Sequence, residues 1–198
     1  MQLIRITLAI VLLYLISCTT PQDPAKEIPQ FLLKFPQTSF AYPVGEKDYV
    51  TEKNDWCDAW YNAQDFGENR HLGEDWNKTT GGDTDCDEPV YATADGEIVF
   101  AQDVGPGWGN VVIIEHTAED GTKIRSLYGH LQTITKTEGK VNRRELIGTI
   151  GSANGRYKCQ LHFEIRWNEC PMWDQAGSGY SDERHGWIDP SEFIEKTR

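Results

Sequence analysis

The stretch Cys159-Gln-Leu-His-Phe-Glu-Ile-Arg-Trp167 carries the clearest structural signal in the chain. From Gln160 onward, polar and apolar residues alternate strictly. Side chains of a strand point to opposite faces with a period of two, so this pattern predicts a half-buried β-strand. We expect one face to pack on a core and the other to line a groove, with His162 at its centre. The apolar positions are Leu161, Phe163, Ile165 and Trp167.

A lone histidine in a strand is most often a solvated polar residue. Two further motifs favour a functional role for His162. His71 and Asp75 lie four residues apart in His71-Leu-Gly-Glu-Asp75. His130 lies in the segment Tyr128-Gly-His-Leu131. The glycine in the first motif argues against a helix there, so a loop that leads into a strand is expected.

These three ordered motifs resemble the LytM/lysostaphin-type zinc metallopeptidases, which cut peptidoglycan cross-bridges. The resemblance runs from about Tyr42 to Phe193. It implies an antiparallel β-sheet domain with a groove, and a Zn²⁺ ion held by His71, Asp75 and His162. Three N/O ligands and an open position for water are typical of catalytic zinc. Neutral His130 is then implied as the group that stabilises the charge of the intermediate or shuttles its proton.

Gln160 occupies the position where that family carries its usual general base, the first histidine of a His-x-His pair. An amide can hydrogen-bond a water but cannot take its proton near neutral pH. Losing a general base typically costs a factor of about 10²–10⁴ in rate. Glu164 and His185 are the candidate replacements. Two function classes follow: a peptidase acting on peptidoglycan peptides, and a non-catalytic module that binds cell wall or activates another hydrolase.

The amino terminus predicts export. Arg5 is the only charge before the apolar run Ile6 to Ile16, which is too short to span a bilayer and is typical of a signal peptide. The run ends in Leu15-Ile-Ser-Cys18, which resembles the lipobox of bacterial lipoproteins. Cleavage after residue 17 and lipid on Cys18 would anchor the protein in the cell envelope, with the outer membrane, facing the periplasm, as the expected site.

Acidic residues dominate the chain. The net charge is −12 over 198 residues, and removing residues 1–17 takes away Arg5 alone and makes it −13. Nucleic acid is excluded as a partner, because phosphate contacts need basic patches. Contact with a membrane is therefore expected only through lipid on Cys18.

Four cysteines remain beyond Cys18, and in an exported protein they predict two disulfides. An extended segment from Gln160 to Trp167 is about 25 Å long at about 3.3 Å per residue. Three more residues return only about 10 Å, whereas bridged Cα atoms lie within about 7 Å. A bridge between Cys159 and Cys170 is therefore excluded. The open pairings are Cys57–Cys159 with Cys86–Cys170, or Cys57–Cys170 with Cys86–Cys159.

The rest of the chain predicts a mainly β fold. Turn residues separate apolar runs, and Asp120-Gly121 is a two-residue hairpin signal. The glycine-rich segment 105–109 precedes no helix, so it predicts a hairpin tip over the groove rather than a phosphate loop. His116 is expected to be exposed at a strand end. The predicted strands are 90–92, 97–101, 111–116 and 123–130.

One short helix is predicted at the carboxyl end. Asp189 suits the N-cap, Pro190 the first helical position, and Glu192 completes a capping-box pattern. The domain organisation that follows is a signal peptide at 1–17, a tether at 18–43 that is rich in Pro, Gln, Thr and Lys, and the metallopeptidase-like domain at 44–198.

Overall fold

The computed structural model describes residues 27–35, 40–45 and 60–197. The predicted signal peptide, Cys18 and Cys57 lie outside these residues. Within them, no helix is long and apolar enough to cross a membrane.

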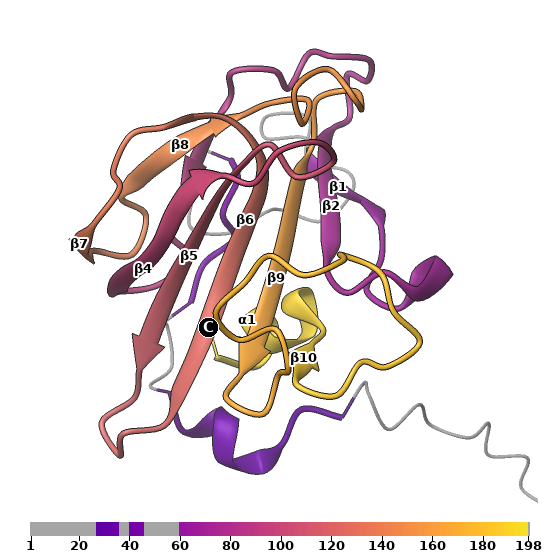
Figure 1. Ribbon diagram of the computed structural model, residues 1–198. Coiled ribbons are helices and arrows are strands. Elements are labelled where there is room, and N and C mark those ends of the chain that lie inside the picture. Colours follow the sequence, from indigo (N-terminus) through magenta and orange to yellow (C-terminus); the bar gives the residue numbers. More distant parts are fainter. Residues whose placement is uncertain (1–26, 36–39, 46–59, 198) are drawn as a thin grey trace, which may run out of the picture.

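An antiparallel sheet forms the body of the described protein (Figure 1). Its main path runs β1-β2-β9-β6-β5-β4-β7, while β8 pairs with β6 and β3, and β10 pairs with β9. The strands are β1 (Trp60–Gln64), β2 (Glu74–Lys78), β3 (Pro89–Tyr91), β4 (Gly96–Asp103), β5 (Asn110–Thr117), β6 (Lys123–Ile134), β7 (Gly139–Val141), β8 (Leu146–Ile150), β9 (Leu161–Trp167) and β10 (Trp187–Ile188). The helical segments are η2 (Gln30–Lys34), η3 (Glu68–Arg70) and α1 (Pro190–Thr197). The predicted mainly β fold is confirmed.

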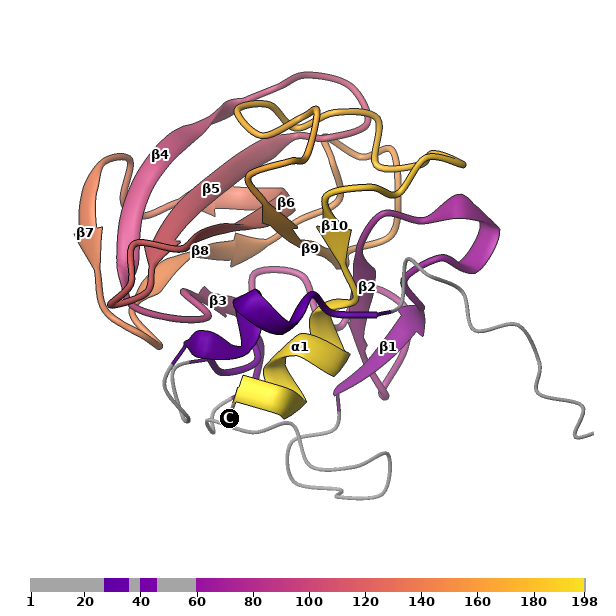
Figure 2. The same cartoon turned by 90° about the horizontal axis from the view of Figure 1, so that it is seen from below.

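Strand β9 is a central strand of the sheet, with β2 on one side and β6 on the other. Its apolar residues Leu161, Phe163 and Ile165 are fully buried in the main core. The core is closed by α1 and η2, which lie side by side on this face (Figure 2). Phe35 and Phe193 meet there with ring centroids 6.3 Å apart.

The polar face of β9 is also buried, so the prediction of a half-buried strand with an open polar face is wrong. His162, Glu164 and Arg166 are at most 2% exposed. The loop between β9 and β10, residues 168–186, crosses over this face (Figure 1). Arg166 donates hydrogen bonds to the carbonyls of Met172 and Ala176 in that loop, each at 2.7 Å. The polar groups can be buried because they are paired.

Part of the predicted tether packs with the domain. Leu32 and Phe40 are at most 1% exposed and belong to the main core. Apolar burial of this kind stabilises a fold by roughly 25 cal/mol per Å². Residues 28–35 and 40–44 therefore belong to the folded unit.

Two local predictions need refinement. The turn at Asp120-Gly121 does join β5 and β6, but its loop has five residues, because β5 ends at Thr117 and β6 begins at Lys123. A two-residue type I′ turn needs positive φ at both central residues, and only Gly121 has it, with φ of 86°. At α1, Asp189 Oδ1 accepts from the Glu192 amide at 3.0 Å, as an N-cap does, but the Glu192 carboxylate pairs with Lys196.

His116 is buried at 1% exposure, so the prediction that it is exposed is wrong. Its Nδ1 donates to the Asp95 carbonyl at 2.8 Å, and its Nε2 pairs with Ser126 Oγ at 2.7 Å. Its ring meets Phe40 on the core side of the sheet, with centroids 5.4 Å apart. Burial lowers the pKa of His116 to about 4, so the ring is neutral.

A disulfide joins Cys86 to Cys159, with Cα atoms 5.1 Å apart. This bridge belongs to the second of the two open pairings. Cys170 is buried and forms no disulfide with a described residue. Its expected partner, Cys57, lies outside the described residues, so that half of the pairing stays a prediction.

Candidate metal centre

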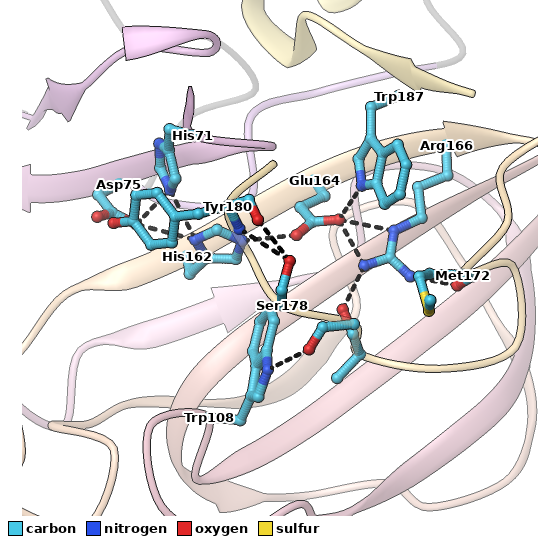
Figure 3. Close-up of polar contacts among 12 residues, drawn as sticks. His71, Asp75, Trp108, His162, Glu164, Arg166, Met172, Ser178, Tyr180 and Trp187 are labelled. Atoms are coloured by element: carbon cyan, nitrogen blue, oxygen red, sulfur yellow. Dashed lines mark hydrogen bonds and ion pairs between the residues drawn. The ribbon is translucent and has the colours of Figure 1, made fainter. Parts of the chain in front are cut away.

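The structure brings His71, Asp75 and His162 together at one edge of the polar face (Figure 3). Asp75 on β2 and His162 on β9 are direct register partners, so their side chains emerge next to each other. His71 lies just before β2 and pairs with Tyr180 in an isolated β-bridge. All three residues are buried, with at most 5% exposure.

The donor atoms have the spacing that a zinc ion requires. His71 Nε2 and His162 Nδ1 are 3.0 Å apart, and Asp75 Oδ1 lies 3.1 Å from the latter and 3.4 Å from the former. Four ligands at about 2.0–2.1 Å in a tetrahedron are separated by roughly 3.3 Å. Two imidazole nitrogens and one carboxylate oxygen are also the ligand types that zinc favours. The residues therefore fit a catalytic zinc site with one coordination position left for water or substrate.

Gly73 allows the two ligands of the first motif to approach β9. A Cβ atom at this position would lie 2.4 Å from the Phe163 carbonyl oxygen and 2.7 Å from Glu164 Cγ. Both distances are far below van der Waals contact. The glycine between His71 and Asp75 is thus required by the close packing of this segment against β9, the strand that carries His162.

The charges of the cluster suit a cation. Burial would raise the pKa of Asp75, but hydrogen bonds with His162 and His71 outweigh it and hold that pKa well below its usual range. Burial would likewise lower the pKa of His162, but its bonds with Asp75 and Glu164 raise it to about 9. Without metal, the cluster therefore favours an ionised Asp75 beside a protonated His162. A divalent cation would take the place of the His162 proton beside the Asp75 carboxylate.

His130 lies beside the cluster, with its ring centroid 5.6 Å from that of His162. Its φ of 63° is rare for a non-glycine residue. The Nδ1 of His130 contacts the Trp108 carbonyl at 3.2 Å, and because a carbonyl only accepts, Nδ1 carries the proton. Burial and the neighbouring His162 charge lower the pKa of His130 to about 4, so the ring is neutral with Nε2 unprotonated.

Gln160 contacts the cluster through a ligand. Its Nε2 donates to Asp75 Oδ2 at 3.2 Å, the carboxylate oxygen that does not face His71 and His162. The amide thus leaves Asp75 Oδ1 facing the two histidines. It offers no basic group at this position.

Neither candidate replacement for the base reaches the open side of the cluster. Glu164 is fully buried behind His162 and accepts from its Nε2 at 2.8 Å. His185 is an exposed residue that pairs with Glu169 at 2.8 Å and packs on Trp167, at the far end of β9. His130 is therefore the described histidine that lies beside the ligands without belonging to them.

Three aromatic side chains border the site, and the sequence predicted the position of only one of them, Trp108 in the glycine-rich tip. Tyr180 stacks on His71 with centroids 5.0 Å apart, and its hydroxyl contacts Gln64 Oε1 at 3.0 Å. Trp108 meets His162 edge-on at 5.0 Å, as expected for a glycine-rich tip over the groove. Tyr157 lies 5.2 Å from His130. These residues come from three loops, where no periodicity marks them.

An apolar cavity of about 620 Å³ lies next to the metal centre on the same sheet face. Leu72, Phe100, Val104 and Met172 line it together with loop residues 175–178. It contains none of the three ligands. A second acidic and cysteine cluster, Asp83 with Cys86 and Cys159, is not a metal site, because both sulfur atoms are used in the disulfide.

Comparison with known proteins decides the family. The sequence pattern of peptidase family M23 matches residues 69–173, which is more than half of the chain. The chain belongs to peptidase family M23. The matched segment contains all three ligands of the candidate metal centre and His130.

Two M23 relatives illustrate the range of roles. The DD-carboxypeptidase/endopeptidase Mpg of Neisseria meningitidis serogroup B is 36% identical over 110 residues, covering 54% of this chain and 24% of that protein. The murein hydrolase activator NlpD of Escherichia coli is 36% identical over 81 residues, covering 40% and 20%. The chain spans about a quarter or less of the length of the first curated relatives it matches.

Solved structures show the same fold. A peptidase M23 structure from Pseudomonas aeruginosa superposes with a TM-score of 0.51 at 20% identity, covering 78% of this chain and 54% of that one. A glycyl-glycine endopeptidase LytM structure from Ruminococcus gnavus gives 0.51 at 17% identity, covering 81% and 61%. At these identities the likeness concerns the fold alone.

Proposed function

We propose that this M23 protein is a zinc metalloendopeptidase that hydrolyses peptide cross-links of bacterial peptidoglycan. The observation that carries the proposal is the convergence of His71 Nε2, Asp75 Oδ1 and His162 Nδ1 at separations of 3.0 to 3.4 Å. Catalytic zinc sites in other proteins use ligand sets of this kind. The chain also belongs to a peptidase family, which supports a hydrolytic role for the three residues.

A zinc ion held by these residues would supply Lewis-acid activation of a scissile carbonyl and of the attacking water. The protein's part is to hold the three donors in place and to manage protons and charge. Asp75 would hold the ion through Oδ1, because Gln160 donates a hydrogen bond to Oδ2. Trp108 and Tyr180 flank the ligands and pack against His162 and His71.

His130 is the residue we assign to proton handling. Its Nδ1 proton is directed to the Trp108 carbonyl, so Nε2 can accept a proton or a hydrogen bond. Its pKa of about 4 makes it a weak base. General bases work best with a pKa near the working pH, so His130 supports only slow turnover on its own.

An envelope location fits this function. The proposal includes cleavage after residue 17 and lipid on Cys18, which would place the domain beside the cell wall. A relative described as lipoprotein NlpD of Yersinia enterocolitica is 36% identical over 81 residues. A Cys18→Ala variant should leave the membrane fraction, and continued partition with membranes would contradict the anchor.

A second candidate function is that of a non-catalytic module that binds the wall or activates another hydrolase. The observation that favours it is Gln160, which cannot replace the usual base. Relatives described as murein hydrolase activators point the same way. The retention of all three ligand residues favours the peptidase.

The test compares the release of soluble fragments from purified peptidoglycan by wild type, Gln160→His and His162→Ala, with zinc content measured for each. Slow release by wild type, faster release by Gln160→His and none by His162→Ala are expected. A histidine at position 160 would provide a base beside the ligands and should raise the rate by up to about 10²–10⁴.

Other outcomes separate the two functions. If the three proteins are equally inert while wild type stimulates a second hydrolase or binds wall, the activator replaces the peptidase. If wild type is already fast and Gln160→His adds nothing, a group already present supplies the base. Substitution of His130 would then be the next test. A wild-type protein that binds no zinc at all would contradict the metal centre.

A further inference from the structure

Glu164 lies directly behind the metal ligand His162 and uses both carboxylate oxygens (Figure 3). Oε1 accepts a hydrogen bond from His162 Nε2 at 2.8 Å. Oε2 accepts from Arg166 Nε at 2.6 Å and from Trp187 Nε1 at 2.7 Å. Glu164 and Arg166 are completely buried. Both oxygens of the Glu164 carboxylate are thus held by side chains in a part of the protein closed to bulk solvent.

This geometry fixes which nitrogen of His162 is available to a metal. A carboxylate accepts hydrogen bonds, so the Nε2 that faces Glu164 carries a proton. Nδ1 is then the nitrogen whose proton a metal would displace, and it lies 3.0 Å from His71 Nε2 and 3.1 Å from Asp75 Oδ1. A carboxylate behind a histidine ligand commonly sets both its tautomer and its ring orientation.

Arg166 extends the arrangement to the loop that covers the site. Its guanidinium donates from Nε to Glu164 Oε2, and Nη2 forms an ion pair with the same oxygen. The two terminal nitrogens also donate to the loop carbonyls of Met172, Gln175 and Ala176. The same loop carries Tyr180, which stacks on His71. The arginine therefore couples the placement of Glu164 to the placement of the loop.

Stability alone does not explain these buried charges. Replacing a buried ion pair by apolar residues of similar volume is often neutral or even stabilising. The neighbouring residue Leu127, which is the register partner of Glu164 on β6, shows that an apolar side chain is accommodated on the same sheet face. A role in placing His162 accounts for the charge.

We propose that Glu164 is a positioning residue that presents Nδ1 of His162 to the metal, and that Arg166 holds Glu164 and the loop 168–186 in register. The inference rests on the metal centre in the proposed function. It adds two residues that contact neither metal nor substrate.

The first experiment is a zinc titration against a competing chelator, with wild type, Glu164→Gln, and the double variant Glu164→Leu/Arg166→Met. The glutamine should turn its oxygen toward Arg166 and its NH₂ toward His162, which places the imidazole proton on Nδ1. A loss of about 10–100-fold in zinc affinity is expected for both variants, as for other partners of metal-bound histidines. The double variant removes both charges together and therefore keeps the test usable if Glu164→Gln does not fold.

Arg125→Met is the matched control. Arg125 is the register partner of Arg166 on β6, is 8% exposed, pairs with Glu115, and donates to the Trp173 carbonyl of the same loop. It contacts neither Glu164 nor a metal ligand in the described contacts. Zinc affinity should stay within about twofold of wild type, whereas a loss as large as that of Glu164→Gln would assign the effect to loop packing in general.

Nitrogen-15 NMR of the histidine rings in zinc-loaded wild type provides the direct readout. A metal-coordinated Nδ1 and a protonated, hydrogen-bonded Nε2 are expected for His162. Coordination through Nε2 would overturn the inference, as would folded Glu164 variants with wild-type zinc affinity. If wild type itself binds no zinc, the proposed function fails before the positioning role is reached, so the two failures are distinguishable.

Discussion

The two faces of the sheet around β9 are both buried, yet they hold histidines in opposite states. On the polar face, His162 lies among carboxylates, which overcome burial and raise its pKa to about 9. On the core face, His116 of β5 meets a hydroxyl, a carbonyl and Phe40, and burial lowers its pKa to about 4. The same residue type is thus a charged group on one face and a neutral core residue on the other. The partners, and not the depth of burial, decide which.

The faces also differ in what they contribute. Phe163 and its apolar neighbours remove hydrocarbon from water and so stabilise the fold. Glu164 and Arg166 pay a large desolvation cost that their mutual attraction roughly offsets. The core face should therefore govern the free energy of unfolding, and the polar face the properties of the metal centre.

The largest stability effect is expected from Phe163→Ala on the core face. Phe163 is fully buried and lies 5.3 Å from Tyr128, ring to ring. Truncating a buried phenylalanine typically costs about 3–5 kcal/mol. Urea unfolding measures this loss directly. A cost below about 1 kcal/mol would mean that the core does not carry the stability.

Arg166→Met should cost nearly as much, about 3–5 kcal/mol, because it leaves the Glu164 charge buried without its counter-ion. Adding Glu164→Leu to the same protein should restore most of the loss. The comparison of the single and the double variant by urea unfolding tests this. If the double variant is no more stable than Arg166→Met, the unpaired Glu164 charge is not the cause of the loss and the contrast between the faces is wrong.

The next effect is a pH dependence on the core face. The unfolded chain takes up a proton at His116 near pH 6.5, whereas the folded chain does so only near pH 4. The folded state therefore loses up to about 3 kcal/mol as the pH falls through this window. Asp95 and Glu115 are the charged neighbours that oppose the shift. Urea midpoints of wild type should fall more steeply from pH 7 to 4.5 than those of His116→Gln, and equal slopes would count against a neutral His116.

The smallest effect is expected where α1 begins. Asp189 Oδ1 accepts the Glu192 amide, and Asp189→Ala removes that cap at a cost of about 1 kcal/mol. Asp189→Asn keeps an acceptor oxygen and is the matched control, with a smaller loss. Thermal unfolding of both variants ranks them. Because α1 covers only the core face, zinc affinity should not change with either substitution.

The sequence predicts one face of β9 better than the other. The alternation after Gln160 identifies Leu161, Phe163 and Ile165 as core residues, and the structure agrees. The resemblance of the three motifs to a known family likewise implies His71, Asp75 and His162 as a cluster, and the structure brings these residues together. The core face is thus predicted from a short-range pattern, whereas the cluster is predicted from likeness to a family.

The loop 168–186, which covers the polar face, has no sequence pattern that predicts its position. Arg166 bonds to backbone carbonyls of a loop, and any residue type supplies a carbonyl. His116 is similar, because its partners are the Asp95 carbonyl and a serine on the next strand. Only tertiary contacts reveal that such polar residues are buried, so a reading of the sequence places them at the surface.

The place of β9 in the sheet has a consequence for the order of folding. Its neighbours β2 and β6 precede it in the chain by about 90 and 40 residues and are joined through it (Figure 1). His71 and Asp75 therefore lie on an incomplete sheet until β9 pairs with β2. Long-range pairing of this kind slows folding. The metal centre thus assembles in the same late step that closes the sheet, and a chain that fails to finish folding never presents a complete set of ligands.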